Sequence, residues 1–171
     1  MTEPKHSNLL FVGDSLIEYF DWQARFPTLQ VSNQGVAGET AQGLRRRCQE
    51  IVTTVPAPDW LLIMIGTNNV VMEDFSFLPT YEAIIDTLVK AYPKSSIVVN
   101  GLFPMQLPWL GHEAVADLNQ YLAQLAQKKS CSYLDGCKVV GNNKFFMADG
   151  VHISDQGYEL WSAAVEEILT Q

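Results

Sequence analysis

The stretch Leu9-Leu10-Phe11-Val12-Gly13-Asp14-Ser15-Leu16 passes from four consecutive apolar residues into a polar turn and then into a helical pattern. A short apolar run that ends at a glycine is typical of a buried strand in a parallel sheet. Ligands bind outside the carboxyl ends of such strands, where helix N-termini also favour negative charge. The stretch therefore predicts Ser15 at the ligand-binding edge of an α/β domain, although Gly-Asp-Ser is also common in turns and helix caps.

Strand-like and helix-like patterns alternate along the whole chain. The predicted strands are residues 9–12, 29–31, 60–65, 97–100 and 133–134. The predicted helices are residues 16–25, 40–53, 80–91, 113–128 and 155–169. This alternation predicts a three-layer α/β/α sandwich around a five-stranded parallel sheet with the flavodoxin-like strand order 2-1-3-4-5. The 171 residues fit one domain, which we place at 1–171.

Composition limits the classes of partner. The formal net charge of −8 is unfavourable for nucleic acid, which needs a basic protein face. The run Arg45-Arg46-Arg47 lies in a helical pattern, so we interpret it as a solvated helix face rather than an anion site. The three cysteines are odd in number and lack metal-ligand spacing, which predicts no metal site, no disulfide framework and a reducing compartment.

Nothing in the sequence indicates insertion into a membrane. Residues 1–8 are polar and contain no apolar core of a signal peptide, and the longest apolar run, residues 60–65, is too short to span a bilayer. These features favour a cytoplasmic location without stable membrane insertion. No feature indicates an oligomeric state.

Polar residues that suit acyl transfer follow four of the predicted strands. Ser15 would be the nucleophile and His152 its general base, because an imidazole exchanges protons near neutral pH. Asp149 lies three residues before His152 and could orient the imidazole. The backbone N–H groups of Ser15 and Gly38 and the side-chain amide of Asn68 would stabilise the oxyanion. Each residue also has a structural alternative: a helix cap for Ser15, a turn for Gly38 and a loop contact for Asn68.

Four short blocks occur in the order found in a known enzyme family. They are Gly13-Asp14-Ser15-Leu16, the segment around Gly38, Gly66-Thr67-Asn68-Asn69 and Asp149-Gly150-Val151-His152. They resemble blocks I, II, III and V of the SGNH (GDSL) hydrolases. Many members have aspartate where this chain has Asn69, and the Gly-Thr-Asn-Asn form resembles that of platelet-activating-factor acetylhydrolase catalytic subunits. We interpret Asn69 as structural.

The resemblance implies a serine esterase that needs no cofactor and acts on small-molecule esters through a Ser15–His152–Asp149 triad and an acyl-enzyme. Family members include esterases, lipases, thioesterases and deacetylases, and the block III form suggests short or acetyl acyl groups. The apolar residues of the long connection 101–111 either pack on the sheet or line the substrate pocket. The alternative is a non-catalytic module that binds a small ligand or a flavin on the same scaffold.

Overall fold

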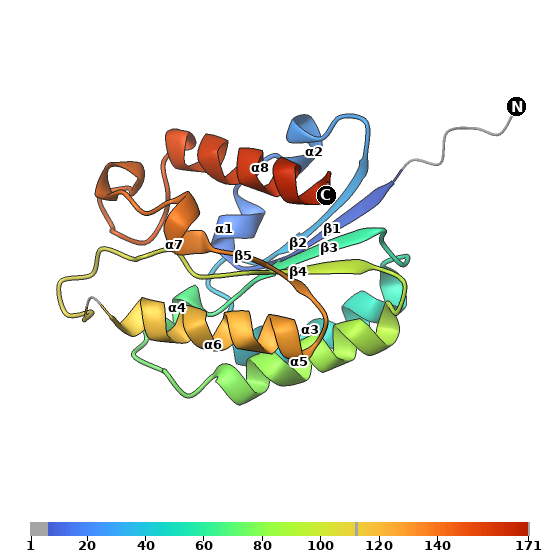
Figure 1. Cartoon of the computed structure of the whole chain (residues 1–171), viewed down its shortest axis with the longest axis horizontal. Coiled ribbons are helices and arrows are strands. Elements are labelled where there is room, and N and C mark those ends of the chain that lie inside the picture. The colour runs from blue at the N-terminus through green and yellow to red at the C-terminus, as the bar shows by residue number, and fades with distance from the viewer. Residues whose placement is uncertain (1–6, 112, 171) are drawn as a thin grey trace, which may run out of the picture. The chain divides into compact units, whose positions relative to one another are not determined.

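The computed structural model describes residues 7–111 and 113–170 and contains a five-stranded sheet with the order β2-β1-β3-β4-β5 (Figure 1). The strands are β1 (Asn8–Gly13), β2 (Gln30–Gly35), β3 (Trp60–Met64), β4 (Ser96–Asn100) and β5 (Ser132–Leu134). The helices are α1 (Ser15–Glu18), α2 (Trp22–Arg25), α3 (Ala41–Thr54), α4 (Thr67–Val71), α5 (Leu78–Ala91), α6 (Ala114–Lys128), α7 (Gly136–Val139), the 3₁₀ helix η1 (Asn143–Phe145) and α8 (Asp155–Leu169). The predicted α/β class and strand order are confirmed.

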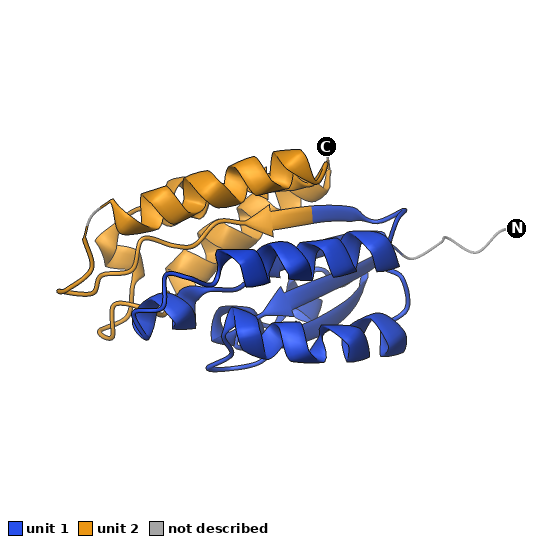
Figure 2. Ribbon diagram, turned by 90° about the horizontal axis from the view of Figure 1, so that it is seen from below, with its two compact units in different colours: residues 1–97 blue, residues 98–171 orange. Residues whose placement is uncertain are grey.

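The chain divides into two compact units, residues 1–97 and 98–171 (Figure 2). In the first unit β1 pairs in parallel with β2 and with β3. The register places Gly13 opposite both Gly35 and Met64, so the three strands end at the same level. Helices α1 and α2 cover one face of these strands, and α3 and α5 cover the other (Figure 1). Since both faces are covered, β1 is an almost continuous apolar run.

The second unit contains the parallel pair of β4 and β5, with α6 on one face and α8 on the other (Figure 1). Its core is built around Trp161 of α8. The Trp161 ring lies edge-on to Phe103, with 5.1 Å between the ring centroids. The indole N–H donates to Oδ1 of the buried Asn100 at the end of β4, over 2.8 Å. Part of the connection 101–111 is therefore core rather than surface loop.

The predicted helix 16–25 is wrong, because the structure has two short helices there. α1 ends at Glu18, and Asp21 begins α2 by accepting a hydrogen bond from the backbone N–H of Ala24 at 2.9 Å. An aspartate side chain that accepts from a backbone N–H as an N-cap favours the start of a new helix over continuation of the preceding one at its position. Trp22, at the start of α2, is buried and stacks on Phe11 with 3.9 Å between the ring centroids.

Four other elements were predicted too short or were not predicted. β2 begins at Gln30 and continues to Gly35, although only residues 29–31 were predicted. It is partly exposed along its length, so the polar run Ser32-Asn33-Gln34 carries no apolar signal. The segment after Gly66 forms the short helix α4, and the connection between β5 and α8 contains α7 and η1, none of which was among the predicted elements. Helices of three to five residues leave little periodicity to detect.

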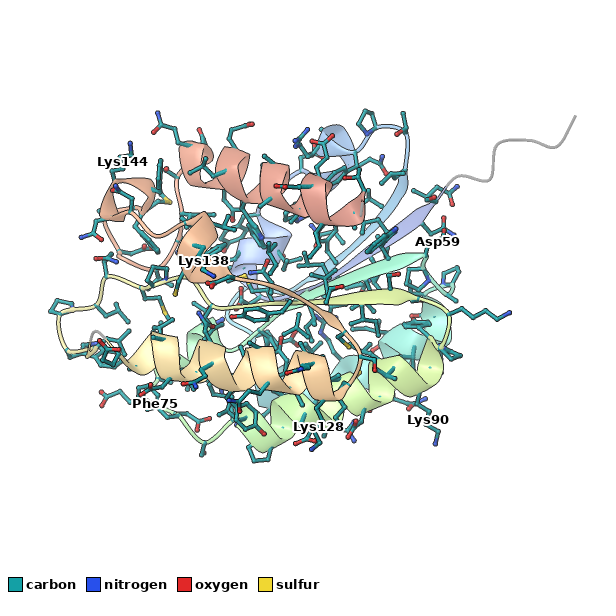
Figure 3. All side chains as sticks on the ribbon, in the orientation of Figure 1. Asp59, Phe75, Lys90, Lys128, Lys138 and Lys144 are labelled. Atoms are coloured by element: carbon teal, nitrogen blue, oxygen red, sulfur yellow. The ribbon has the colours of Figure 1, made fainter. Side chains whose placement is uncertain are left out.

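Charged side chains lie on the outer surfaces of the helices. Lys90 of α5 and Lys128 of α6 are exposed and are labelled in Figure 3. Within residues 7–111 and 113–170, no helix combines the length and the apolar character needed to cross a bilayer.

Asn69 joins the start of α3 to α4 and to the turn that follows it. Its buried side chain accepts from the backbone N–H of Ala41 at 2.8 Å. Its amide nitrogen donates to Gln42 Oε1 at 2.7 Å and to Asp74 Oδ2 at 2.8 Å, and Gln42 also donates to Asp74. The amide therefore supplies two donors and one acceptor within a closed network. This network supports the structural interpretation of Asn69.

We expect the substitution Asn69→Asp to destabilise the protein by about 2–3 kcal/mol. A carboxylate cannot donate to Gln42 and Asp74, and it would place a second negative charge beside Asp74. Adding Asp74→Asn should recover part of the loss, because the second change removes the repulsion and restores a donor. Urea unfolding of the wild type, both single variants and the double variant measures this coupling. A fully stable Asn69→Asp protein would contradict it.

The same network predicts a loss of stability in acid. The pKa of Asp74 is lowered from 3.8 to about 2, first by the hydrogen bond from the Ser76 hydroxyl and then by that from Asn69. Because the folded pKa is the lower one, the ionised carboxylate stabilises the fold fully above about pH 4. That contribution disappears as the pH falls toward about 2. Urea midpoints should show wild type and Asp74→Asn converging over this range, and a constant difference between them would exclude the effect.

Candidate active site

Ser15 is the first residue of α1 and directly follows the turn that ends β1. The side chain of Asp14 accepts a hydrogen bond from the backbone N–H of Leu16 at 3.0 Å, so Asp14 is the N-cap of this helix. Asp14 is completely buried, and Ser15 is 6% exposed. The cap therefore fixes the backbone at Ser15. Ser15 itself occupies the first helical position and not the cap.

The segment between β2 and α3 carries Gly38. The segment begins at Val36, and the N–H of Val36 donates to the carbonyl oxygen of Gly13 at 2.9 Å. The N–H of Ala37 donates to Oε2 of Glu18 at 2.6 Å, which connects this segment to α1. Gly38 has a φ of +76°, a left-handed conformation that glycine adopts without strain. A Cβ atom at Gly38 would have no neighbour within 4 Å, so this position faces open space.

Asn68 is the second residue of α4, the short helix that follows β3. Its amide nitrogen donates to the carbonyl oxygen of Glu39 at 2.9 Å. The structure thus brings Asn68 to the residue next to Gly38, and the predicted alternative of a loop contact is present. An amide nitrogen carries two hydrogens, so this bond leaves one of them for another acceptor. The Gly38 N–H donates to no acceptor in the described part of the chain.

Asp149 and His152 form a tight turn in the second unit, between η1 and α8. His152 Nδ1 lies 2.6 Å from Asp149 Oδ2. The other carboxylate oxygen accepts from the backbone N–H groups of Val151 and His152, at 2.9 and 3.0 Å. Partial burial raises the pKa of Asp149. The hydrogen bonds from His152 and from these N–H groups lower it, and together they outweigh the effect of burial, so the pKa is below its ordinary value. The carboxylate is therefore ionised beside the imidazole.

Gly150 allows this turn to form. It has a φ of +70°, and a Cβ atom there would lie 2.5 Å from the carbonyl oxygen of Gln106. The N–H of Gln106 in turn donates to the carbonyl oxygen of Gly150 at 2.7 Å. The turn of Asp149 and His152 is thus supported by the connection 101–111, a contact that the sequence did not indicate.

The connection 101–111 combines buried residues with exposed ones. Phe103 and Met105 are buried, whereas Trp109 is 47% exposed. A hollow of about 320 Å³ is lined by residues 104–108, by Leu110 and Gly111, and by Val115. Part of this loop is therefore buried and part lines a hollow, and a role of the hollow in substrate binding stays a prediction.

The structure brings the predicted residues together in two groups. Ser15, Gly38 and Asn68 lie in the first unit, on segments joined by the bonds from Ala37 to Glu18 and from Asn68 to Glu39. Asp149 and His152 are in direct contact in the second unit. Within the described residues, no group of three histidine, cysteine, aspartate or glutamate side chains could hold a metal ion. The sequence analysis missed Glu18 and Glu39 because their contacts join distant segments.

Known proteins are similar to nearly the whole chain. Human platelet-activating factor acetylhydrolase IB subunit alpha2 is 26% identical over 178 residues, which cover 98% of this chain and 78% of that protein. Two solved structures share the fold at 24% identity. A Streptococcus pneumonia chain described as a platelet activating factor has a TM-score of 0.84 and covers 98% of this chain and 86% of its own. A variant of Axe2, an acetylxylan esterase from Geobacillus stearothermophilus, has a TM-score of 0.75, with coverages of 98% and 95%.

A family model distinguishes between the two predicted functions. The model of the GDSL-like lipase/acylhydrolase family matches residues 11–160, a range that includes all the predicted site residues. This match favours the hydrolase over a flavin-binding or other non-catalytic module. The chain belongs to the GDSL-like lipase/acylhydrolase family and is a carboxylic ester hydrolase.

Proposed function

We propose that the protein cleaves carboxylic esters with short acyl groups through an acyl-enzyme formed on Ser15. The contact of 2.6 Å between His152 Nδ1 and Asp149 Oδ2 carries this proposal. An ionised carboxylate at Nδ1 holds the proton on that nitrogen and leaves the lone pair on Nε2. Nε2 is then the base that the Ser15 hydroxyl requires, and the family's block order supports the combination of the two groups into one triad.

The reaction has two balanced halves. Ser15 Oγ attacks the ester carbonyl carbon while its proton passes to His152 Nε2, and the carbonyl oxygen becomes an oxyanion. When the oxyanion collapses, the bond to the alcohol oxygen breaks, and the alcohol leaves with the proton from Nε2. Water then attacks the carbonyl carbon of the acyl-enzyme and gives a proton to Nε2. When this second oxyanion collapses, the bond to Ser15 Oγ breaks, Oγ takes the proton from Nε2, and the acid is released. Asp149 stabilises the imidazolium in each half.

Three N–H donors are proposed to bind the oxyanion: the backbone N–H of Ser15, the backbone N–H of Gly38 and the side-chain amide of Asn68. Ser15 lies at the start of a helix, where N–H groups lack acceptors within the helix. The N–H of Gly38 has no acceptor among the described residues and lies in an open position. Donors of this kind stabilise the transition state more than the ground state.

The triad predicts complete dependence on Ser15. Hydrolysis of p-nitrophenyl acetate by Ser15→Ala should fall at least roughly a thousandfold, because the nucleophile is lost. The exposed Ser132 of β5 provides the control, and Ser132→Ala should keep wild-type activity. A fluorophosphonate probe should add its mass to the peptide that contains Ser15 and to no other peptide. Equal activity in wild type and Ser15→Ala, or labelling at another residue, would exclude this mechanism.

Short acyl groups should be preferred. The acetylhydrolase among the relatives and the Gly-Thr-Asn-Asn form of block III support this expectation. In a series of p-nitrophenyl esters from acetate to decanoate, kcat/KM should be highest for the shortest chains and decline with length. A maximum at octanoate or decanoate would refute the preference and leave the serine mechanism intact.

A further inference from the structure

Arg47 differs from its two neighbours in the run Arg45-Arg46-Arg47. Arg45 and Arg46 are exposed, as predicted for a solvated helix face. That prediction is wrong for Arg47, whose side chain is 21% exposed and binds Glu39, whose side chain is 8% exposed. Arg47 Nε lies 2.7 and 3.0 Å from the two carboxylate oxygens of Glu39, and Nη2 lies 2.7 Å from Oε2. Nη2 also donates to the carbonyl oxygen of Gln34 at 2.6 Å.

Glu39 connects this ion pair to both of the oxyanion donors outside α1. It directly follows Gly38 in the chain, and its main-chain carbonyl oxygen accepts the hydrogen bond from Asn68. The first turn of α3 leaves room for its side chain, because a Cβ atom at Gly43 would lie 2.9 Å from Glu39 Cγ. On the other side of Gly38, Ala37 is held by Glu18. Both neighbours of Gly38 are therefore fixed by carboxylate side chains.

Gly38 needs such support because packing does not provide it. The residue is exposed, and no atom lies within 4 Å of the position of a Cβ atom. Its peptide orientation depends on the flanking residues. A guanidinium that binds both oxygens of a carboxylate restricts orientation as well as distance. We infer that Arg47 is a positioning residue that, through Glu39, holds the Gly38 N–H and the Asn68 amide in the geometry that binds the oxyanion. This inference rests on the proposed function.

The test compares Arg47→Gln with Arg46→Gln, since both substitutions remove one positive charge from the same helix. Arg46 makes no hydrogen bond or ion pair in the part of the chain that the structure describes, so its variant should match the wild type. For Arg47→Gln, kcat on p-nitrophenyl acetate should fall roughly tenfold to a hundredfold, while KM changes by less than about twofold. Arg47→Lys should be intermediate, because an ammonium cannot bind both oxygens in a fixed plane.

A transition-state analogue separates positioning from a general structural effect. Inhibition by a trifluoromethyl ketone should weaken across the variants in proportion to the loss of kcat/KM, whereas inhibition by the product acetate should not change. Thermal unfolding monitors the fold. If Arg47→Gln does not fold, Glu39→Gln replaces it, because this variant keeps the backbone carbonyl and weakens only the ion pair. The same pattern of kcat, KM and inhibition is expected there.

The outcomes distinguish this inference from the proposed function. A folded Arg47→Gln with the kcat and the analogue affinity of the wild type would overturn the inference alone. Changes in Arg47→Gln that affect acetate binding as strongly as analogue binding would also overturn it, because they would indicate a structural role. A wild-type protein without esterase activity would overturn the proposed function and this inference with it.

Discussion

The parallel hydrogen bonding of β1 to a strand on each side is the constraint on which the first unit depends. A strand with neighbours on both sides has no free edge, so its end and the ends of both neighbours are set by one register. Here that register aligns Gly13 with Gly35 and with Met64. The three segments that follow these strands therefore begin at the same level. The segments that carry Ser15, Gly38 and Asn68 thus all begin at the carboxyl ends of these strands, on the same side of the sheet.

Contacts beyond the sheet then set the geometry at this edge. Carboxylates and amides connect the segments: Asp14 caps α1, Glu18 holds Ala37, and Glu39 accepts from Asn68. The turn of Asp149 and His152 is built differently. The hydrogen bonds of the Asp149 carboxylate lie within four consecutive residues, so the local sequence can form them wherever Gly150 permits the turn. Outside these four residues, the N–H of Met147 donates to the carbonyl oxygen of His152, the Met147 carbonyl oxygen accepts from Gly150, and the N–H of Gln106 donates to the carbonyl oxygen of Gly150.

The buried parts of the fold could be predicted because burial on both faces requires continuous apolar sequence. β1 and β3 have this pattern, and their predicted positions are close to the observed ones. β2 was predicted too short because Ser32, Asn33 and Gln34 lie in a partly exposed strand, where backbone pairing does not require apolar residues. The break at Asp21 escaped prediction for a related reason. The first helix ends and the second begins there because of a single capping hydrogen bond, whereas the helical spacing of apolar residues continues through Asp21.

The sequence by itself determined the fold class, the strand order and the identity of the candidate catalytic residues, because these follow from hydrophobic periodicity and from short motifs in a fixed order. Only the tertiary structure decided which polar residues support them. Arg47 is indistinguishable from Arg45 and Arg46 in sequence, and the sequence does not indicate which residues the side chain of Asn69 binds. Arg47 binds Glu39 and Asn69 binds Asp74 because the packing of α3 and α4 brings these side chains together, and spacing along the chain does not indicate these pairs. Side-chain hydrogen bonds require distances near 3 Å, and chain folding alone sets those distances between separate elements.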